Sequence, residues 1–189
     1  MFREVLQKLI DYYAEVCSRR GSPVPPSTGV FLCCAAILRG CRGLIVDVGA
    51  GYGVSTLFLA LGVSTGGLGR VLGIEVCREK LKFLRAKARE LGLDVFIDVV
   101  RGDVKYILKA LIRPIALLFL DAKKEEYLDY LKCAEGKLLR GSLVLAHNVL
   151  WPRLYVFAEY LRCVMDFQRY LTTVLQLDPA GVSFTVKIT

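Results

Sequence analysis

Short apolar runs alternate with longer, more polar segments along most of this chain, and this alternation constrains its fold more than any other feature. Each apolar run is short enough to be a β-strand, and the segment after it is long enough to be a helix. Strands that are apolar on both faces and joined by helices predict a parallel sheet that is covered on both sides. The five runs occupy residues 44–48, 70–76, 94–100, 114–121 and 141–147. The helices expected after the fourth and fifth runs cover 123–139 and 153–169.

The two ends of the chain depart from this repeat. The first 20 residues have the pattern of an amphipathic helix, and a second helix is expected over about 28–39, after the proline-rich SPVPPS. The last residues, TTVLQLD, PAG and VSFTVKIT, predict a β-hairpin. We therefore predict one domain over 1–189: a doubly wound α/β fold with a mostly parallel seven-stranded sheet, an antiparallel C-terminal hairpin strand, and N-terminal helices (about 1–39) that pack on it or cap it.

Composition limits the class of protein. A hydrophobic fraction of 54% over 189 residues argues against disorder, and no apolar run reaches the roughly 18–20 residues that span a bilayer. Arg3, Glu4 and Lys8 interrupt the region where a signal peptide would be apolar. These features predict a cytoplasmic protein without a membrane span. One asparagine and three glutamines indicate a heat-adapted source, in which thermolabile amides are scarce.

Net charge and cysteine content say less about which ligands the protein binds. The formal net charge of +8 suits an anionic ligand or a nucleic-acid surface. Many of the basic residues, however, alternate with glutamates in the helical segment 77–92, which is typical of a solvated face, so nucleic-acid binding is the less favoured alternative. The seven cysteines show no metal-ligand spacing, and we expect them to be small buried hydrophobic residues.

Polar residues follow each of the five predicted strands. In a parallel sheet the carboxyl ends of the strands meet at one edge, and ligands bind there. The only histidine and the only asparagine of the chain stand together at the end of the fifth strand. These strand ends therefore predict a functional site. In chain order the strand ends carry Asp47 and the loop GAGYG, then Glu75, Gly102-Asp103, Asp121 and His147-Asn148.

The glycine loop fits the loose pattern GxGxG, in which glycines let a nucleotide-bearing ligand approach the backbone at a helix N-terminus. A tight turn between strand and helix is the structural alternative. Glu75 strengthens the ligand interpretation, because an acidic residue at the end of the second strand can accept hydrogen bonds from ribose hydroxyls. Its alternative role is to cap the next helix. The spacing from Gly49 to Glu75 suits either a dinucleotide or S-adenosylmethionine.

A family resemblance decides between these two ligands. The segments DVGAGYG, GIEV, RGD, LFLDAKKEEY and LVLAHNVLW, together with the closing hairpin, resemble class I S-adenosylmethionine-dependent methyltransferases with a Rossmann-like fold. More narrowly, they resemble the catechol and caffeoyl-CoA O-methyltransferases. The resemblance runs from about residue 25 to 188, and its most specific part is the pairing of LFLDAKKEEY with AHNVLW.

The resemblance implies roles for individual residues. Glu75 falls on the ribose-binding acid, and Asp121 falls on the first metal-binding aspartate, which also borders the cofactor. Lys124 falls on the lysine that acts as general base in related enzymes. The family's Asp-Asn metal pair falls on His147 and Asn148. The remaining cofactor positions are Asp47, Gly49, Ala50, Gly51, Gly53 and Ser55 around the methionine part, and Gly102, Asp103 and Val104 around the adenine.

His147 is a departure from the family pattern, because an imidazole replaces a carboxylate. Three outcomes stay open. The site binds manganese, iron, cobalt or zinc in place of magnesium; or it binds metal weakly or not at all, and His147 serves as a base; or catalysis is reduced. The structural alternatives are that Asn148 caps a loop while His147 fills space, and that Lys124 is a surface charge paired with Glu125 and Glu126.

The resulting functional prediction is an O-methyltransferase of a small hydroxylated, catechol-like acceptor. The aromatic residues Trp151, Tyr155, Phe157 and Tyr160 either offer surface to a flat acceptor or belong to the core. The first helix either covers the pocket or pairs with a second subunit in a homodimer. Two other functions stay open: an RNA or protein methyltransferase, and a non-catalytic module that binds the cofactor.

Overall fold

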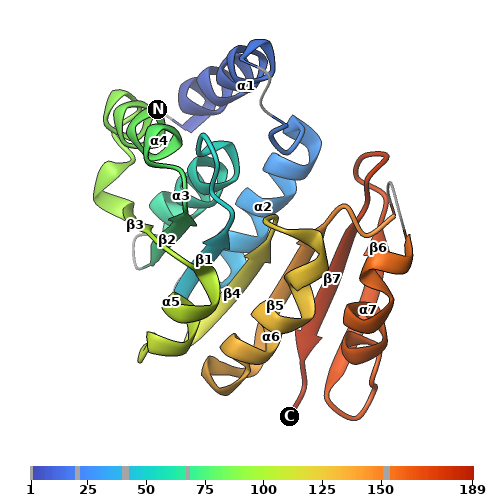
Figure 1. Ribbon diagram of the computed structural model, residues 1–189. Coiled ribbons are helices and arrows are strands. Elements are labelled where there is room, and N and C mark those ends of the chain that lie inside the picture. Colours follow the sequence, from blue (N-terminus) through green and yellow to red (C-terminus); the bar gives the residue numbers. More distant parts are fainter. Residues whose placement is uncertain (1, 20–21, 40–42, 67–68, 151–153) are drawn as a thin grey trace.

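The computed structural model describes residues 2–19, 22–39, 43–66, 69–150 and 154–189, and a single sheet lies at its centre (Figure 1). The strand order is β3-β2-β1-β4-β5-β7-β6. Neighbours among β1 to β5 pair in parallel, and β7 is antiparallel to both β5 and β6. The predicted doubly wound α/β fold, with a mostly parallel seven-stranded sheet and an antiparallel hairpin strand, is therefore confirmed. The strands are β1 (Leu44–Val48), β2 (Arg70–Glu75), β3 (Ile97–Arg101), β4 (Ile115–Leu120), β5 (Leu138–His147), β6 (Tyr170–Leu175) and β7 (Val182–Lys187).

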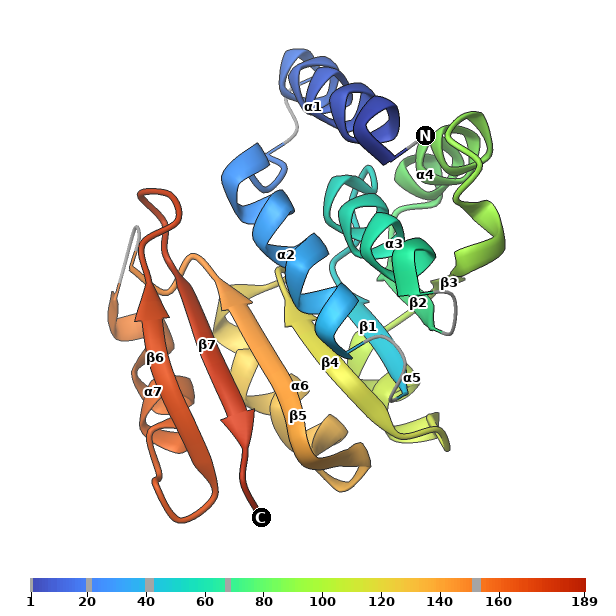
Figure 2. The same ribbon diagram turned by 180° about the vertical axis from the view of Figure 1, so that it is seen from behind.

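Helices cover both faces of the sheet, as Figures 1 and 2 show from opposite sides. The helices α1 to α4 lie on one side and α5 to α7 on the other. Two separate clusters of buried apolar residues, one on each face, hold these layers together. The α-helices are α1 (Phe2–Ser18), α2 (Pro26–Arg39), α3 (Val54–Gly66), α4 (Arg78–Glu90), α5 (Val104–Ala110), α6 (Tyr127–Ala134) and α7 (Ala158–Val164); the 3-10 helices are η2 (Asp94–Phe96), η3 (Lys124–Glu126), η4 (Glu135–Lys137) and η5 (Leu154–Phe157).

The helix α3 follows the glycine loop and is the most deeply buried helix. Every residue from Val54 to Val63 is buried. A helix that is apolar all round has to be enclosed on all sides. Here the sheet lies beneath α3, and α1 and α2 pack against it from outside, with Leu9 and Leu32 fully buried in the same cluster. The N-terminal helices thus complete the core that the first β-α unit requires.

Several element boundaries differ from the sequence prediction. The third strand begins at Ile97, because the 3-10 turn η2 occupies the first three residues of the predicted strand. The helix expected over 123–139 is divided into η3, α6 and η4, and β5 begins early, since Leu138 already pairs with Ile115. The helix expected over 153–169 ends at Val164. The sequence patterns therefore predicted the type of these elements correctly, but their first and last residues less accurately.

The carboxyl ends of the first four strands are joined by backbone hydrogen bonds. The amide of Asp121 donates to the carbonyl of Val48 at 2.9 Å, and the amides of Gly49 and Ala50 donate to the carbonyl of Ile74, each at 3.0 Å. Figure 2 shows α1 beyond the edge toward which the arrows of β4 and β5 point. This edge is where the sequence predicts the site. Among the described residues, no helix has the length and apolar character that crossing a membrane requires.

The cysteines correct one expectation. The six described cysteines are free thiols. Cys33 is buried as expected, but Cys17 and Cys34 are exposed, so the prediction that the cysteines are buried is wrong for these two. Both lie on outward faces of the N-terminal helices, which the sequence pattern did not orient. Cys41 lies outside the described residues.

Candidate active site

The loop after β1 has to be made of glycines, for reasons of backbone geometry. Gly49 and Gly53 have φ values of 91° and 96°, in a region that side-chain-bearing residues rarely adopt. A Cβ at Gly49 would lie 2.6 Å from the carbonyl oxygen of Asp121, and one at Gly53 would lie 2.3 Å from Cδ1 of Leu84. Gly51 also has a positive φ, of 55°, but a Cβ there would meet nothing closer than 3.8 Å. Two glycines therefore permit close packing, and the third faces open space.

Asp47 lies beneath this loop and supports it. The carboxyl group is fully buried, and its Oδ2 accepts hydrogen bonds from Ser55 Oγ at 2.8 Å and Thr56 Oγ1 at 2.5 Å. Burial raises the pKa of Asp47 to about 7, and the two hydroxyl donors offset part of that effect. Both donors come from the first turn of α3, so Asp47 joins the end of β1 to the start of the helix.

Glu75, the last residue of the neighbouring strand β2, holds the glycine loop in place through hydrogen bonds. Its Oε2 accepts a hydrogen bond from the amide of Gly51 at 3.0 Å, and its Oε1 accepts one from the amide of Cys77 at 2.8 Å. The side chain is 8% exposed and borders a cavity. Glu75 therefore does more than cap a helix, because it holds the glycine loop in position and also lines the cavity.

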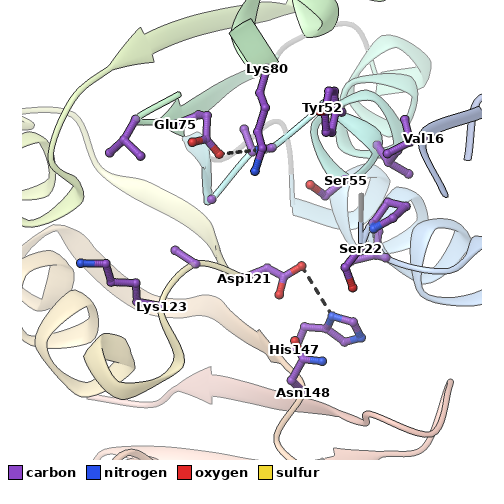
Figure 3. Close-up of a pocket in the computed structure, with 18 of the residues that line it drawn as sticks. Val16, Ser22, Tyr52, Ser55, Glu75, Lys80, Asp121, Lys123, His147 and Asn148 are labelled. Carbon is purple, nitrogen blue, oxygen red and sulfur yellow. Dashed lines mark hydrogen bonds and ion pairs between the residues drawn. The ribbon is translucent and has the colours of Figure 1, made fainter. Parts of the chain in front are cut away.

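One cavity of about 610 Å³ joins the glycine loop to the ends of β4 and β5. Figure 3 shows Glu75 on one side of it and Asp121, His147 and Asn148 on the other. The structure thus brings together most of the predicted site residues. Those that line the cavity are Gly49, Ala50, Gly51, Ser55, Glu75, Asp121, Lys124, His147 and Asn148.

The other predicted site residues lie at the same edge of the sheet but do not line this cavity. Asp47 lies beneath the loop, and Gly53, the last residue of the loop, packs against Leu84. Gly102 donates its amide to the carbonyl of Glu75 at 3.3 Å, and Asp103 caps α5 by accepting the amide of Tyr106 at 3.0 Å. The assignment of Gly102, Asp103 and Val104 to the adenine of a cofactor stays a prediction.

One wall of the cavity comes from the N-terminal segment and carries none of the predicted site residues. Val16, at the end of α1, lines the cavity, as do residues 22–24 before α2. The hydroxyl of Tyr12 donates to the backbone carbonyl of Tyr52 at 2.8 Å, which fastens α1 to the glycine loop. No local motif marks this contact, because residues 40 positions apart make it through tertiary packing.

Lys124 belongs to a polar cluster at the end of β4. Its ammonium group donates to Asp121 Oδ1 and, at 3.0 Å, to the hydroxyl of Tyr127. That hydroxyl in turn donates to the backbone carbonyl of His147 at 3.2 Å. The side chain of Lys124 is 28% exposed, compared with 76% for Lys123. Lys123 is therefore the solvated surface charge, and Lys124 lies in the site.

The ring of His147 is 6% exposed and lies between two carboxylates. Nδ1 is 3.5 Å from Oδ2 of Asp121, and Nε2 is 3.0 Å from Oδ2 of Asp178. Burial alone would lower the pKa of His147, but the interactions with Asp121 and Asp178 outweigh it, so the pKa lies above its usual value of 6.5. Asn148 has a φ of 68°, in the left-handed region, and it turns the chain at the cavity.

These residues do not fit a magnesium ion. Magnesium takes oxygen ligands in a near-octahedral arrangement, whereas Asp121 is the one carboxylate that lines the cavity at the ends of β4 and β5, and its Oδ1 already accepts a hydrogen bond from the ammonium of Lys124. His147 supplies nitrogen, and its Nε2 is bound to Asp178. No group of three or more histidine, cysteine or acidic residues able to hold a metal occurs within the described part of the chain.

The aromatic residues after β5 contribute little surface to the cavity. Phe157 and Tyr160 are buried in the apolar cluster beneath the sheet, which agrees with the core alternative. The side chain of Tyr155 is 70% exposed and does not line the cavity. Trp151 lies outside the described residues. An aromatic acceptor would therefore have to be bound mainly by other groups of the described site.

Known proteins resemble the chain in sequence and in fold. It is 30% identical over 128 residues to the catechol O-methyltransferase of Mycobacterium tuberculosis, which covers 67% of this chain and 57% of the relative. It is 25% identical over 146 residues to the caffeoyl-CoA O-methyltransferase of Medicago sativa, with 71% and 58% covered. The chain thus spans a little over half the length of the curated relatives that it matches.

A solved structure shows the same fold over nearly the whole chain. The O-methyltransferase TomG of Streptomyces achromogenes, determined in complex with S-adenosylmethionine, has a TM-score of 0.82 and 21% identity and covers 98% of this chain and 90% of its own. The family model of the methyltransferase domain matches residues 46–149, which include the end of β1, all of β2 to β5 and every predicted site residue. The chain therefore belongs to the methyltransferase-domain family.

Proposed function

We propose that this protein is an S-adenosylmethionine-dependent O-methyltransferase that acts on a small hydroxylated acceptor, with catechol-like aromatics as the first class to test. One observation carries the proposal. The same cavity contains the glycine loop with Glu75 on one side and the cluster of Asp121, Lys124 and His147 on the other. A sulfonium cofactor bound along the loop would direct its methyl group toward that cluster. The names of the relatives support the choice of oxygen as the methyl acceptor.

On the cofactor side, the open backbone at Gly51 and the carboxylate of Glu75 are the groups that would hold the nucleoside. Both oxygens of Glu75 already accept backbone amides, so the carboxylate is fixed before a ligand arrives. Each oxygen has a second lone pair, to which a ribose hydroxyl can donate. A pre-positioned acceptor of this kind costs little conformational entropy on binding.

On the acceptor side, proton removal is the chemical task. The hydroxyl of the acceptor passes its proton to Nδ1 of His147, and the oxygen forms a bond to the methyl carbon while the carbon–sulfur bond breaks. The electron pair of that bond stays on sulfur, so the products are a methyl ether, S-adenosylhomocysteine and a protonated His147. Lys124 donates two of its three N–H bonds to Asp121 and Tyr127, and the third is available to the developing oxyanion.

The test is a methyl-transfer assay on the purified full chain, with labelled S-adenosylmethionine, catechol-type acceptors, and either EDTA or one of a panel of divalent cations. We expect transfer that persists in EDTA. We also expect the rate to rise as pH passes the raised pKa of His147, because only the unprotonated imidazole accepts a proton. Lys124→Met should lower kcat about 10²-fold, whereas Lys132→Met, an exposed residue of α6, should not.

Three other results of this assay would each change the proposal. Cofactor binding without transfer to any acceptor would favour the non-catalytic module. Methyl incorporation into RNA or protein in place of small acceptors would redirect the proposal to a macromolecular substrate. Transfer that is abolished by EDTA and restored by one cation would show that His147 acts beside a metal.

A further inference from the structure

His147 is held from the side opposite the cavity by a residue that the family resemblance does not assign. Asp178 lies in the turn between β6 and β7, 31 residues after His147, and its Oδ2 is 3.0 Å from Nε2 of the ring. Its side chain is buried, with 4% exposed. The contact is therefore a buried hydrogen bond between a carboxylate and an imidazole, of the kind that is strong when water is excluded.

Every other described partner of Asp178 is a hydrogen-bond donor. Its Oδ2 accepts from the hydroxyl of Thr28, which is fully buried near the start of α2. Its Oδ1 accepts from the backbone amides of Ala180 at 2.8 Å and Gly181 at 3.2 Å. Burial would raise the pKa of Asp178, but these donors and His147 outweigh it and hold the pKa below its usual value. Asp178 is therefore an acceptor toward the ring, and Nε2 must carry a proton.

The turn that carries Asp178 is fixed to the segment that carries His147. The amide of Leu150 donates to the carbonyl of Ala180 at 2.8 Å. Gly181 has a φ of 68°, and a Cβ there would lie 2.5 Å from Cγ of Leu150, so the side chain of Leu150 packs directly on the backbone of Gly181. Because both ends of the Asp178–His147 hydrogen bond are held in this way, the ring has little freedom to turn.

A proton on Nε2 decides what the cavity side of the ring can do. A neutral imidazole carries one N–H donor and one acceptor nitrogen, and the hydrogen bond at one nitrogen selects the state of the other. Nδ1 is buried beside Asp121, with Oδ2 of that carboxylate 3.5 Å away, and it makes no closer hydrogen bond among the described residues. It is therefore the nitrogen that can take up a proton, at the end of the ring next to Asp121.

We propose that Asp178 and Thr28 are positioning residues, which hold His147 with its proton on Nε2 so that Nδ1, beside Asp121, is the proton acceptor of the ring. This inference rests on the proposed function for its catalytic consequence, but the arrangement of the ring can be measured without any activity. The charged or titratable groups near His147 are Asp121 and Lys124 at the end of β4, Tyr127 of α6, and Asp178 itself.

Because the chain has a single histidine, NMR can observe His147 alone. The full chain, labelled with ¹⁵N-histidine and purified without a histidine tag, should show a protonated Nε2 and an unprotonated Nδ1 once the pH exceeds the pKa of the ring. In Asp178→Asn the charge is lost and both tautomers should appear. Asp166→Asn is the matched control, because Asp166 also accepts a backbone amide in a turn, from Gln168 at 3.1 Å, but lies away from the site. It should leave the spectrum unchanged.

Kinetics test the catalytic consequence. Asp178→Asn should lower kcat at least about tenfold, since removing the carboxylate partner of a catalytic histidine disturbs its tautomer, while KM for the acceptor changes less than about threefold. Thr28→Val removes one donor to Asp178 and keeps the carboxylate, so it should have a smaller effect in the same direction. It also serves as the second variant if Asp178→Asn does not fold.

Defined results would overturn the inference. A wild-type spectrum with the proton on Nδ1, or an Asp178→Asn spectrum identical to that of the wild type, would show that Asp178 does not position the ring. A Thr28→Val spectrum identical to that of the wild type would show that Thr28 does not contribute to this positioning. An unchanged kcat in Asp178→Asn would show that the arrangement is not used in catalysis. If the wild type transfers no methyl group while its spectrum shows the expected tautomer, the proposed function fails and the positioning of the ring stands.

Discussion

Replacing Gly49 by alanine tests how closely the glycine loop approaches the end of β4. An added Cβ would lie 2.6 Å from the carbonyl oxygen of Asp121 and 2.8 Å from both N and Cα of Ala122. All three atoms belong to the backbone, so no side-chain rotation relieves the contact. The strand end that carries Asp121 would have to move, and alanine would also have to adopt a φ of 91°.

The expected cost follows from these two effects. A side-chain-bearing residue in a sparsely populated backbone region costs about 1–3 kcal/mol, and overpacking in a closely packed region costs about another 1–3 kcal/mol. The free energy of unfolding of Gly49→Ala should therefore fall by about 2–6 kcal/mol. Gly51→Ala is the matched control, since its Cβ would meet nothing closer than 3.8 Å. We expect it to lose only the roughly 1 kcal/mol that a left-handed conformation costs.

Urea unfolding followed by far-ultraviolet circular dichroism measures both variants against the wild type. The slope of the free energy against urea should be the same in all three proteins, so that the shift in midpoint reports stability. If Gly49→Ala and Gly51→Ala lose the same stability within about 0.5 kcal/mol, the loop does not approach Asp121 as described, and the geometry of the site is wrong.

Three further predictions concern the cavity and its support. Glu75→Gln turns one acceptor of a backbone amide into a donor, and S-adenosylhomocysteine should then bind at least about tenfold more weakly by calorimetry; an unchanged Kd would exclude the ribose role. Asp47, with a folded-state pKa of about 7, keeps its proton between pH 4 and 7 while the unfolded chain loses it, so the stability of the wild type should fall by up to about 4 kcal/mol over that range. Urea titrations at pH 5 and pH 8 should show a smaller loss of stability with rising pH in Asp47→Asn than in the wild type. An equal loss in the two proteins would contradict the raised pKa of Asp47. Tyr12→Phe removes the hydrogen bond to Tyr52, so amides of α1 should exchange hydrogen faster, by the equivalent of about 1 kcal/mol; unchanged exchange would show that α1 is held in another way.

The fold could be predicted from the sequence because the patterns that indicate strands and helices are local. The runs LIVDV and IALLFL are fully buried in β1 and β4, and a glycine or proline near each run marks its limits. The carboxyl ends of parallel strands share one edge by geometry, so the sequence alone places Glu75 and Asp121 near the glycine loop. Strand and helix limits were less accurate, because tertiary pairing such as that of Leu138 with Ile115 extends or shortens an element.

The remaining parts of the site depend on contacts between distant segments. Thr28 and Asp178 are 150 positions apart, and an aspartate in a turn is expected whether or not it contacts a histidine. The cavity wall from Val16 and residues 22–24 likewise has no motif of its own. The resemblance supplied Lys124, which the charge pattern alone would have assigned to the surface. Its partner Tyr127 became identifiable only in three dimensions.

A crystal structure of the protein with S-adenosylhomocysteine would show whether the cavity holds the cofactor. We expect the ribose hydroxyls within hydrogen-bond distance of Glu75, the amino-acid part along the glycine loop, and the sulfur facing Asp121 and His147. A complex in which the ligand lies elsewhere, or in which its sulfur faces away from His147, would refute the proposed site.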